Sequence, residues 1–170
     1  MQFSDAIKRG IEIVKLNRET VRQVAADAEA FAPALLITAL VGIAMWISPP
    51  SFAIHGIVTL PLLALVGLFL GSAILHFIAH LLGGHGDYMA LLRVLGTGRV
   101  LGWVRLIPIL GPLADLWTLV IAVVALEELY GLDRGKAVLT VAIPVAVLVV
   151  LGLIGLIFGA MVLGVFVAGF

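Results

Sequence analysis

Apolar and charged residues alternate at helical spacing through the first thirty positions. From Phe3 to Phe31, apolar side chains recur every three or four residues, with charged residues between them. This spacing predicts an amphipathic helix. Asn17 suits the amino-terminal cap of a second helical piece, so we expect a break near Leu16. Because an apolar span follows directly, residues 1–30 are expected to lie as an interfacial helix in the headgroup region, or else to bind a partner.

Long apolar runs replace this pattern from residue 31 onward. A helix needs about 20 apolar residues to cross a hydrocarbon core of about 30 Å. On this basis we expect a membrane domain over 31–170 with five spans, at residues 31–47, 56–82, 94–110, 114–130 and 137–165.

The third and fifth spans are the irregular ones. Residues 94–110 contain Arg105 and end among prolines and glycines, so this segment is either a short span whose arginines reach back to the surface or part of a longer tilted helix. The apolar run from Ala137 to Phe170 is too long for one crossing and too short for two. Tilt, a kink at Pro144 or a disordered tail is expected to absorb the excess.

Composition places the chain in the membrane class. Of 170 residues, 63% are hydrophobic and 12% charged, and the mean hydropathy is +1.26. Soluble domains are roughly half apolar and about a quarter charged. The start of the chain does not read as a cleavable signal, and the lack of cysteine excludes disulfides and thiolate metal sites. The predicted fold is an all-α integral membrane protein of five transmembrane helices preceded by an amphipathic interfacial helix.

The positive charges predict an orientation. All ten fall in three segments: the amino-terminal part (Lys8, Arg9, Lys15, Arg18, Arg22), the region after span two (Arg93, Arg99, Arg105) and the turn after span four (Arg134, Lys136). Five spans would put all three segments on one side, and positive loops favour the cytoplasm. We therefore expect a multi-pass protein of the inner (plasma) membrane, with its amino terminus cytoplasmic and its carboxyl terminus outside.

Candidate chemistry gathers between Ile74 and Arg93. His76 and His80 are four residues apart and share a helix face, and His85 and Asp87 follow closely. Imidazole and carboxylate groups could bind zinc, copper or nickel, although no third ligand has a fixed helical spacing. The alternative is that these side chains lie at the membrane surface and bind water, phosphate or backbone.

Several other residues have a predicted role. Arg93, Arg99 and Arg105 are candidates for contact with anionic lipid headgroups, or they only set topology. Small residues four apart, Gly67 with Gly71 and Gly155 with Gly159, predict close helix packing within the bundle or between chains.

Acidic residues near the ends of the fourth span have ordinary structural explanations. Asp115 is expected to cap this span, and Glu127 and Glu128 to pair on the surface beside Arg134 and Lys136. No nucleophile and base pair and no phosphate-binding motif is present, so we predict no catalytic residue, no cofactor and no nucleic-acid partner.

Short motifs along the chain resemble those of the Yip family (Ypt-interacting proteins). They are Leu82-Gly83-Gly84, Leu-Trp-x-Leu at 116–119, Tyr130-Gly131-Leu132, Gly135-Lys136-Ala137 leading to Pro144, and the approach to the first span at 17–21. The resemblance covers roughly residues 17–160. It implies a five-helix bundle with a cytosolic amino terminus. Eukaryotic relatives bind small Rab-type GTPases and act in vesicle traffic, but the chain lacks their long cytosolic amino-terminal region.

The leading hypothesis is a non-enzymatic membrane protein, a small prokaryotic member of this kind. It would act in membrane organisation or trafficking, or as a scaffold or accessory subunit, with the lipid bilayer, a second copy or another membrane protein as its partner. The alternative is a small transporter or channel for a cation or lipid that uses His76, His80 and Asp87.

Overall fold

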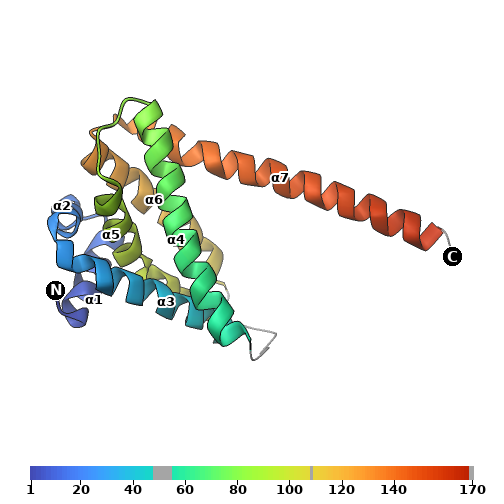
Figure 1. The fold of residues 1–170 in the computed structure, drawn as a ribbon, viewed down its shortest axis with the longest axis horizontal. Helices are drawn as coiled ribbons and strands as arrows, with labels where there is room; N and C mark the ends of the chain where they lie inside the picture. The colour runs from blue at the N-terminus through green and yellow to red at the C-terminus, as the bar shows by residue number, and fades with distance from the viewer. Residues whose placement is uncertain (48–54, 108, 169–170) are drawn as a thin grey trace.

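The computed structural model describes residues 1–47, 55–107 and 109–168, and every element within these ranges is a helix (Figure 1). The elements are α1 (Phe3–Val14), α2 (Arg18–Ala26), η1 (Ala28–Ala30), α3 (Phe31–Ile47), α4 (Gly56–Leu81), α5 (Tyr88–Gly98), η2 (Arg99–Leu106), α6 (Gly111–Tyr130) and α7 (Arg134–Ala168), where η denotes a 3₁₀ helix. Residues 48–54, between the first two predicted spans, lie outside the described residues.

The predicted break in the amino-terminal segment is confirmed. Leu16 takes a left-handed φ of 63°, which ends α1, and the Asn17 side chain accepts a hydrogen bond from the Thr20 amide at 3.2 Å. An amino-terminal cap of this kind satisfies an amide that the first turn of a helix leaves without a partner.

Three helices are long and apolar enough to cross a membrane, within the parts of the chain that are described. They are Ala28–Ile47, Gly56–Leu81 and Arg134–Val162, which correspond to the first, second and fifth predicted spans. Helix α6 covers the fourth predicted span, but it carries Asp115, Glu127 and Glu128 and is not among the three.

No single helix covers the third predicted span, 94–110. Helix α5 ends at Gly98 and the 3₁₀ helix η2 continues to Leu106, so the five-span count is not confirmed. Both pieces press closely on α3, where a Cβ at Gly96 would meet Ala34 and one at Gly102 would meet Val41 at 2.6 Å. From their rises per residue, α5 and η2 together extend about 30 Å.

Helix α5 is the centre of the fold, because α1, α2, α3, α4 and α6 all pack on it. Leu91, Leu92 and Val94 of α5 are fully buried. The same core contains Ile13 of α1 and Val24 of α2 together with residues of α6. Part of the apolar stripe of α1 and α2 therefore packs on protein, and the location of these helices in the headgroup region stays a prediction.

Helices α3 and α4 cross at a glycine. A Cβ on Gly42 would lie 2.4 Å from Cα of Pro61, so the two backbones are in direct contact. Small residues permit such close approach between helices.

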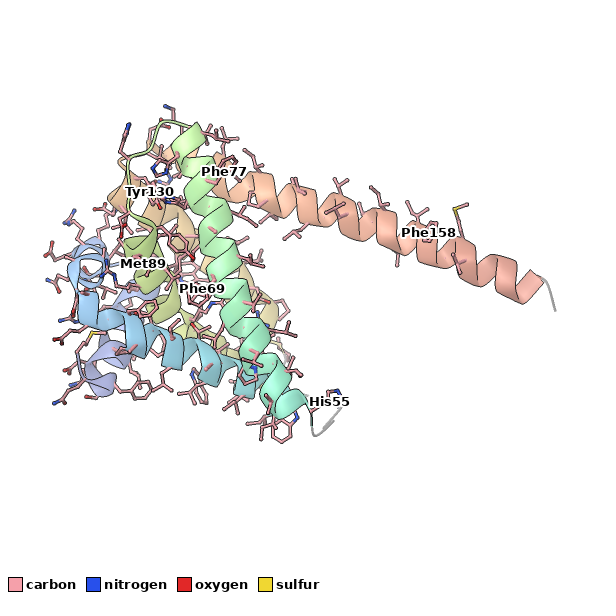
Figure 2. All side chains as sticks on the ribbon, viewed as in Figure 1. His55, Phe69, Phe77, Met89, Tyr130 and Phe158 are labelled. Carbon is pink, nitrogen blue, oxygen red and sulfur yellow. The ribbon has the colours of Figure 1, made fainter. Side chains whose placement is uncertain are left out.

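Helix α7 leaves the rest of the structure. It contacts α4 and α6, then extends away from the other helices (Figure 1). Only 6% of its most apolar 18-residue window is buried, and the helix continues through Pro144. At about 50 Å it exceeds the thickness of a hydrocarbon core. Figure 2 shows Phe158 on the part of α7 that no other helix accompanies.

Candidate functional site

The loop after α4 wraps around Tyr130, the last residue of α6. A Cβ at Gly86 would lie 2.6 Å from atoms of the Tyr130 ring, and one at Gly84 would lie 3.0 Å from the Tyr130 Cβ. The His85 amide donates to the Tyr130 carbonyl at 3.2 Å. Only glycines allow the loop to lie this close. The loop therefore covers Tyr130, which is 3% exposed.

The Tyr130 hydroxyl lies 2.7 Å from Nδ1 of His76, which joins α6 to α4 by a hydrogen bond. His80 does not complete a polar site with His76, because its own Nδ1 bonds to the His76 carbonyl at 3.0 Å. The two imidazole rings lie against each other and against the Tyr130 ring. This cluster connects helices, as buried polar side chains usually do.

The four predicted metal ligands are not brought together. Asp87 caps α5 by accepting from the Ala90 amide at 2.7 Å, while His76 faces Tyr130. Among the residues that the structure describes, no three histidine, cysteine or acidic side chains gather as a metal site requires. The metal hypothesis for His76, His80, His85 and Asp87 therefore has no supporting geometry.

The three spaced arginines lie in different environments. The Arg93 side chain is 14% exposed, with Nη2 3.8 Å from Asp87 Oδ2, so little of it is available to a lipid headgroup. Arg99 donates from Nη1 to the Ala64 carbonyl of α4 at 3.1 Å. Arg105 pairs with Asp115.

Asp115 does not cap its helix as predicted. Helix α6 begins at Gly111, four residues earlier, with Pro112 in its first turn. This leaves the Asp115 carboxylate to pair with Arg105 across the turn between η2 and α6.

The structure separates two of the positive charges, Arg105 and Lys136, along α4. Arg105 lines a cavity with Leu60 and Leu63, in the first turns of α4, whereas Gly83, just past the other end of α4, lies near the Lys136 ammonium. Arg105 and Lys136 therefore lie near opposite ends of a 26-residue helix. The arrangement does not support a shared side for Arg105, because α5 and η2 run back along α4, and the prediction that all ten positive charges face one side of the membrane stays a prediction.

The glycine rows do not mark helix contacts within the chain. A Cβ added at Gly67, Gly71, Gly155 or Gly159 would meet nothing within 4 Å. No contact among the described residues therefore supports close packing within the bundle at these positions. Packing of the four glycines between chains stays a prediction.

Two cavities meet at Arg99. The first, about 370 Å³, is lined by Arg99, Arg105, Asp115 and Thr118 together with apolar residues of α3 and α4. The second, about 220 Å³, lies between α4, α6 and α7 and is almost entirely apolar. Gly67, Arg99 and Thr118 line both.

An ion-pair cluster that we name the α2 clamp joins the amino-terminal segment to α6. Arg18 bonds to both Glu127 and Glu128, and Arg22 bonds to Glu128. These hydrogen bonds raise the pKa of the Arg18 guanidinium. The two glutamates were expected to pair with Arg134 and Lys136. Their partners are instead more than 100 residues away in sequence, a separation that periodicity cannot reveal.

The comparisons with known proteins agree with the motifs named from the sequence. No curated protein and no solved structure matches the chain significantly. The Yip1 domain family model, however, matches residues 11–157. Two of the motifs that carry the resemblance meet in the structure, because Gly84 of the first lies against Tyr130 and Leu132 of the other. With residues 11–157 of its 170 matched, this chain belongs to the Yip1 domain family.

Proposed function

We propose that this chain is a non-enzymatic, multi-pass membrane protein that acts in membrane organisation or trafficking, as a scaffold or accessory subunit. Membership of the Yip1 domain family supports a membrane protein of trafficking. The observation that carries the proposal is α7, whose apolar surface lies almost entirely outside the fold. A contiguous apolar surface of this size needs lipid or another protein to cover it.

Association between copies is the form of scaffold that α7 favours. Gly155 and Gly159 are four residues apart, and neither meets another part of the chain. Small residues at this spacing let two helices approach closely in lipid, where packing rather than hydrophobic burial drives association.

The absence of cysteine makes this testable by cross-linking in native membranes. Gly155→Cys and Gly159→Cys variants should form disulfide-linked dimers on mild oxidation. Leu153→Cys and Ile157→Cys, on other faces of α7, should do so weakly. Ser4→Cys on α1 is the control for random collision. Equal cross-linking at all α7 positions, or none at any, would remove the case for a specific α7 interface.

We also propose that the amino terminus faces the cytoplasm of the cell that carries this protein in its inner (plasma) membrane. The α2 clamp holds the basic amino-terminal segment beside the end of α6, close in sequence to Arg134 and Lys136. Arg18 and Arg134 line one cavity at this end of α6, and positive charges that gather in this way favour the cytoplasm.

An impermeant thiol reagent tests the orientation. Applied outside intact cells, it should fail to label Ser4→Cys and Gly135→Cys, and it should label both after permeabilisation. Labelling of either residue from outside would reverse the proposed orientation.

A further inference from the structure

We propose that the two cavities that meet at Arg99 form one binding site for an anionic phospholipid, with the lipid phosphate at Arg99 and an acyl chain in the apolar cavity between α4, α6 and α7. The proposal does not depend on α7 self-association.

The cavity of about 370 Å³, which we call the head cavity, carries a net positive charge. Two guanidinium groups and one carboxylate line it, Arg99, Arg105 and Asp115, which leaves one net positive charge. Asp115 is paired with Arg105. Arg99 has no carboxylate partner among the described residues, and its recorded hydrogen bond goes to the neutral carbonyl of Ala64. A guanidinium has five N–H donors, so Arg99 can still bind a phosphate.

The guanidinium of Arg99 lies well along an apolar helix. Ala64 is the ninth residue of α4, so Arg99 sits about 12 Å along a helix that is apolar enough to span the membrane. Charged side chains at such depth are rare and mark functional sites or paired groups. An anion that reaches this depth from the membrane carries an apolar part with it.

The second cavity, between α4, α6 and α7, which we call the chain cavity, offers apolar space for an acyl chain. It is lined by Gly71, Leu75, Leu119, Val145 and Leu148, and by one buried polar group, Ser72. Ser72 is 1% exposed, and its hydroxyl has no hydrogen-bond partner among the described residues. Buried hydroxyls are ordinarily paired. An ester oxygen of a lipid bound in this cavity would supply the missing acceptor.

Two glycines of α4 leave open space in the walls of the cavities. Gly67 and Gly71 have no neighbour within 4 Å of an added Cβ, and both line the cavities. The predicted packing row on α4 is therefore an open wall of the site. Together the cavities have about 590 Å³ (370 and 220 Å³), within the range of roughly 300–1,000 Å³ that is usual for small-molecule sites.

The test counts lipids bound to the purified full chain by native mass spectrometry. Phosphatidylglycerol and phosphatidylcholine with identical acyl chains are the probes. The natural chain should retain one phosphatidylglycerol in preference to phosphatidylcholine. Arg99→Gln should lower phosphatidylglycerol occupancy at least about tenfold, whereas Arg134→Gln, which removes an exposed arginine at the first position of α7, should leave it unchanged.

A second variant keeps the charge and fills the chain cavity. Gly71→Leu should lower phosphatidylglycerol binding because the leucine occupies the space for the acyl chain, while Gly152→Leu on the exposed part of α7 should not. Thermal unfolding of each variant shows whether it folds. If Arg99→Gln and Arg134→Gln lowered phosphatidylglycerol occupancy equally, the lipid would be held by unspecific surface attraction, and the proposal would be overturned.

Inorganic phosphate separates a lipid from a free anion. It should not compete with phosphatidylglycerol at millimolar concentration, because it cannot fill the chain cavity. Full competition by phosphate, or unchanged binding with Gly71→Leu, would show a simple anion site and overturn the lipid assignment. None of these outcomes bears on cross-linking of α7, so the two proposals can fail separately.

Discussion

The hydroxyl of Tyr130 and Nδ1 of His76 lie 2.7 Å apart and connect the end of α6 to α4 beneath a glycine loop. Tyr130 packs its Cβ on Gly84 and its ring on Gly86, and its hydroxyl bonds to His76, so one side chain holds two helices and a loop together. Two of the motifs that carry the family resemblance, 82–84 and 130–132, therefore meet in one contact.

Tyr130→Phe should destabilise the fold while leaving the ring packing intact. The substitution removes one partner of a part-buried hydrogen bond, which costs about 1 kcal/mol. Thermal unfolding in detergent measures the loss. In a His76→Phe background, the same substitution should cost much less, since both polar partners are then gone. Equal costs in the two backgrounds would show that the hydrogen bond contributes nothing.

Gly42→Ala should weaken the contact between α3 and α4. The added methyl would lie 2.4 Å from Cα of Pro61, so the helices must separate, and overpacking of this kind costs about 1–3 kcal/mol. Gly152→Ala on α7 is the matched control, because nothing lies within 4 Å of the added Cβ. If both variants unfold at the same temperature as the natural chain, the close crossing is absent in the membrane.

Asp87 should matter as a helix cap and not as a metal ligand. Asp87→Ala removes the acceptor of the Ala90 amide and should cost about 1 kcal/mol, whereas Asp87→Asn keeps a side-chain oxygen and should cost less. Thermal unfolding without zinc measures the stability that the cap contributes, and thermal unfolding with added zinc tests for metal binding. Stabilisation by zinc that is lost in both variants would restore the metal hypothesis.

Breaking the α2 clamp should loosen the amino-terminal segment without unfolding the bundle. Arg18→Gln removes both bonds from Arg18 to Glu127 and Glu128, so amide exchange across 18–26 should rise a few-fold while α4 stays protected. Lys8→Gln removes the same charge from an exposed position of α1 and should leave exchange unchanged. Faster exchange throughout the chain would instead indicate general destabilisation.

The amino-terminal segment should also lose stability in acid. A hydrogen bond from Arg22 lowers the pKa of the Glu19 carboxyl below its ordinary value of 4.5. A lowered folded-state pKa contributes stability above the unfolded-state pKa, and this stability is lost as the pH falls through the folded-state pKa. The effect is small because Glu19 is exposed.

Thermal unfolding at about pH 6 and about pH 3.5 measures this contribution. Glu19→Gln, which cannot titrate, should show a smaller decrease between the two values than the natural chain. An identical decrease in both would assign the acid sensitivity to other carboxylates.

Residue order alone determined the local features of this protein. Apolar runs determined the positions of α3, α4 and α7, and Asn17 determined the start of α2, because these properties depend on neighbours within one or two turns. The short motifs identified the family before any contact was known, and the match over residues 11–157 confirmed it.

The tertiary structure decided what distant residues do together. Charge counting grouped Arg105 with Lys136 on one side of the membrane, whereas the return of α5 and η2 along α4 places the two residues near opposite ends of α4. The glutamates of α6 bind arginines of α2, and Gly67 opens a cavity instead of packing on a helix. These outcomes depend on how helices cross in space, which periodicity along one chain does not encode.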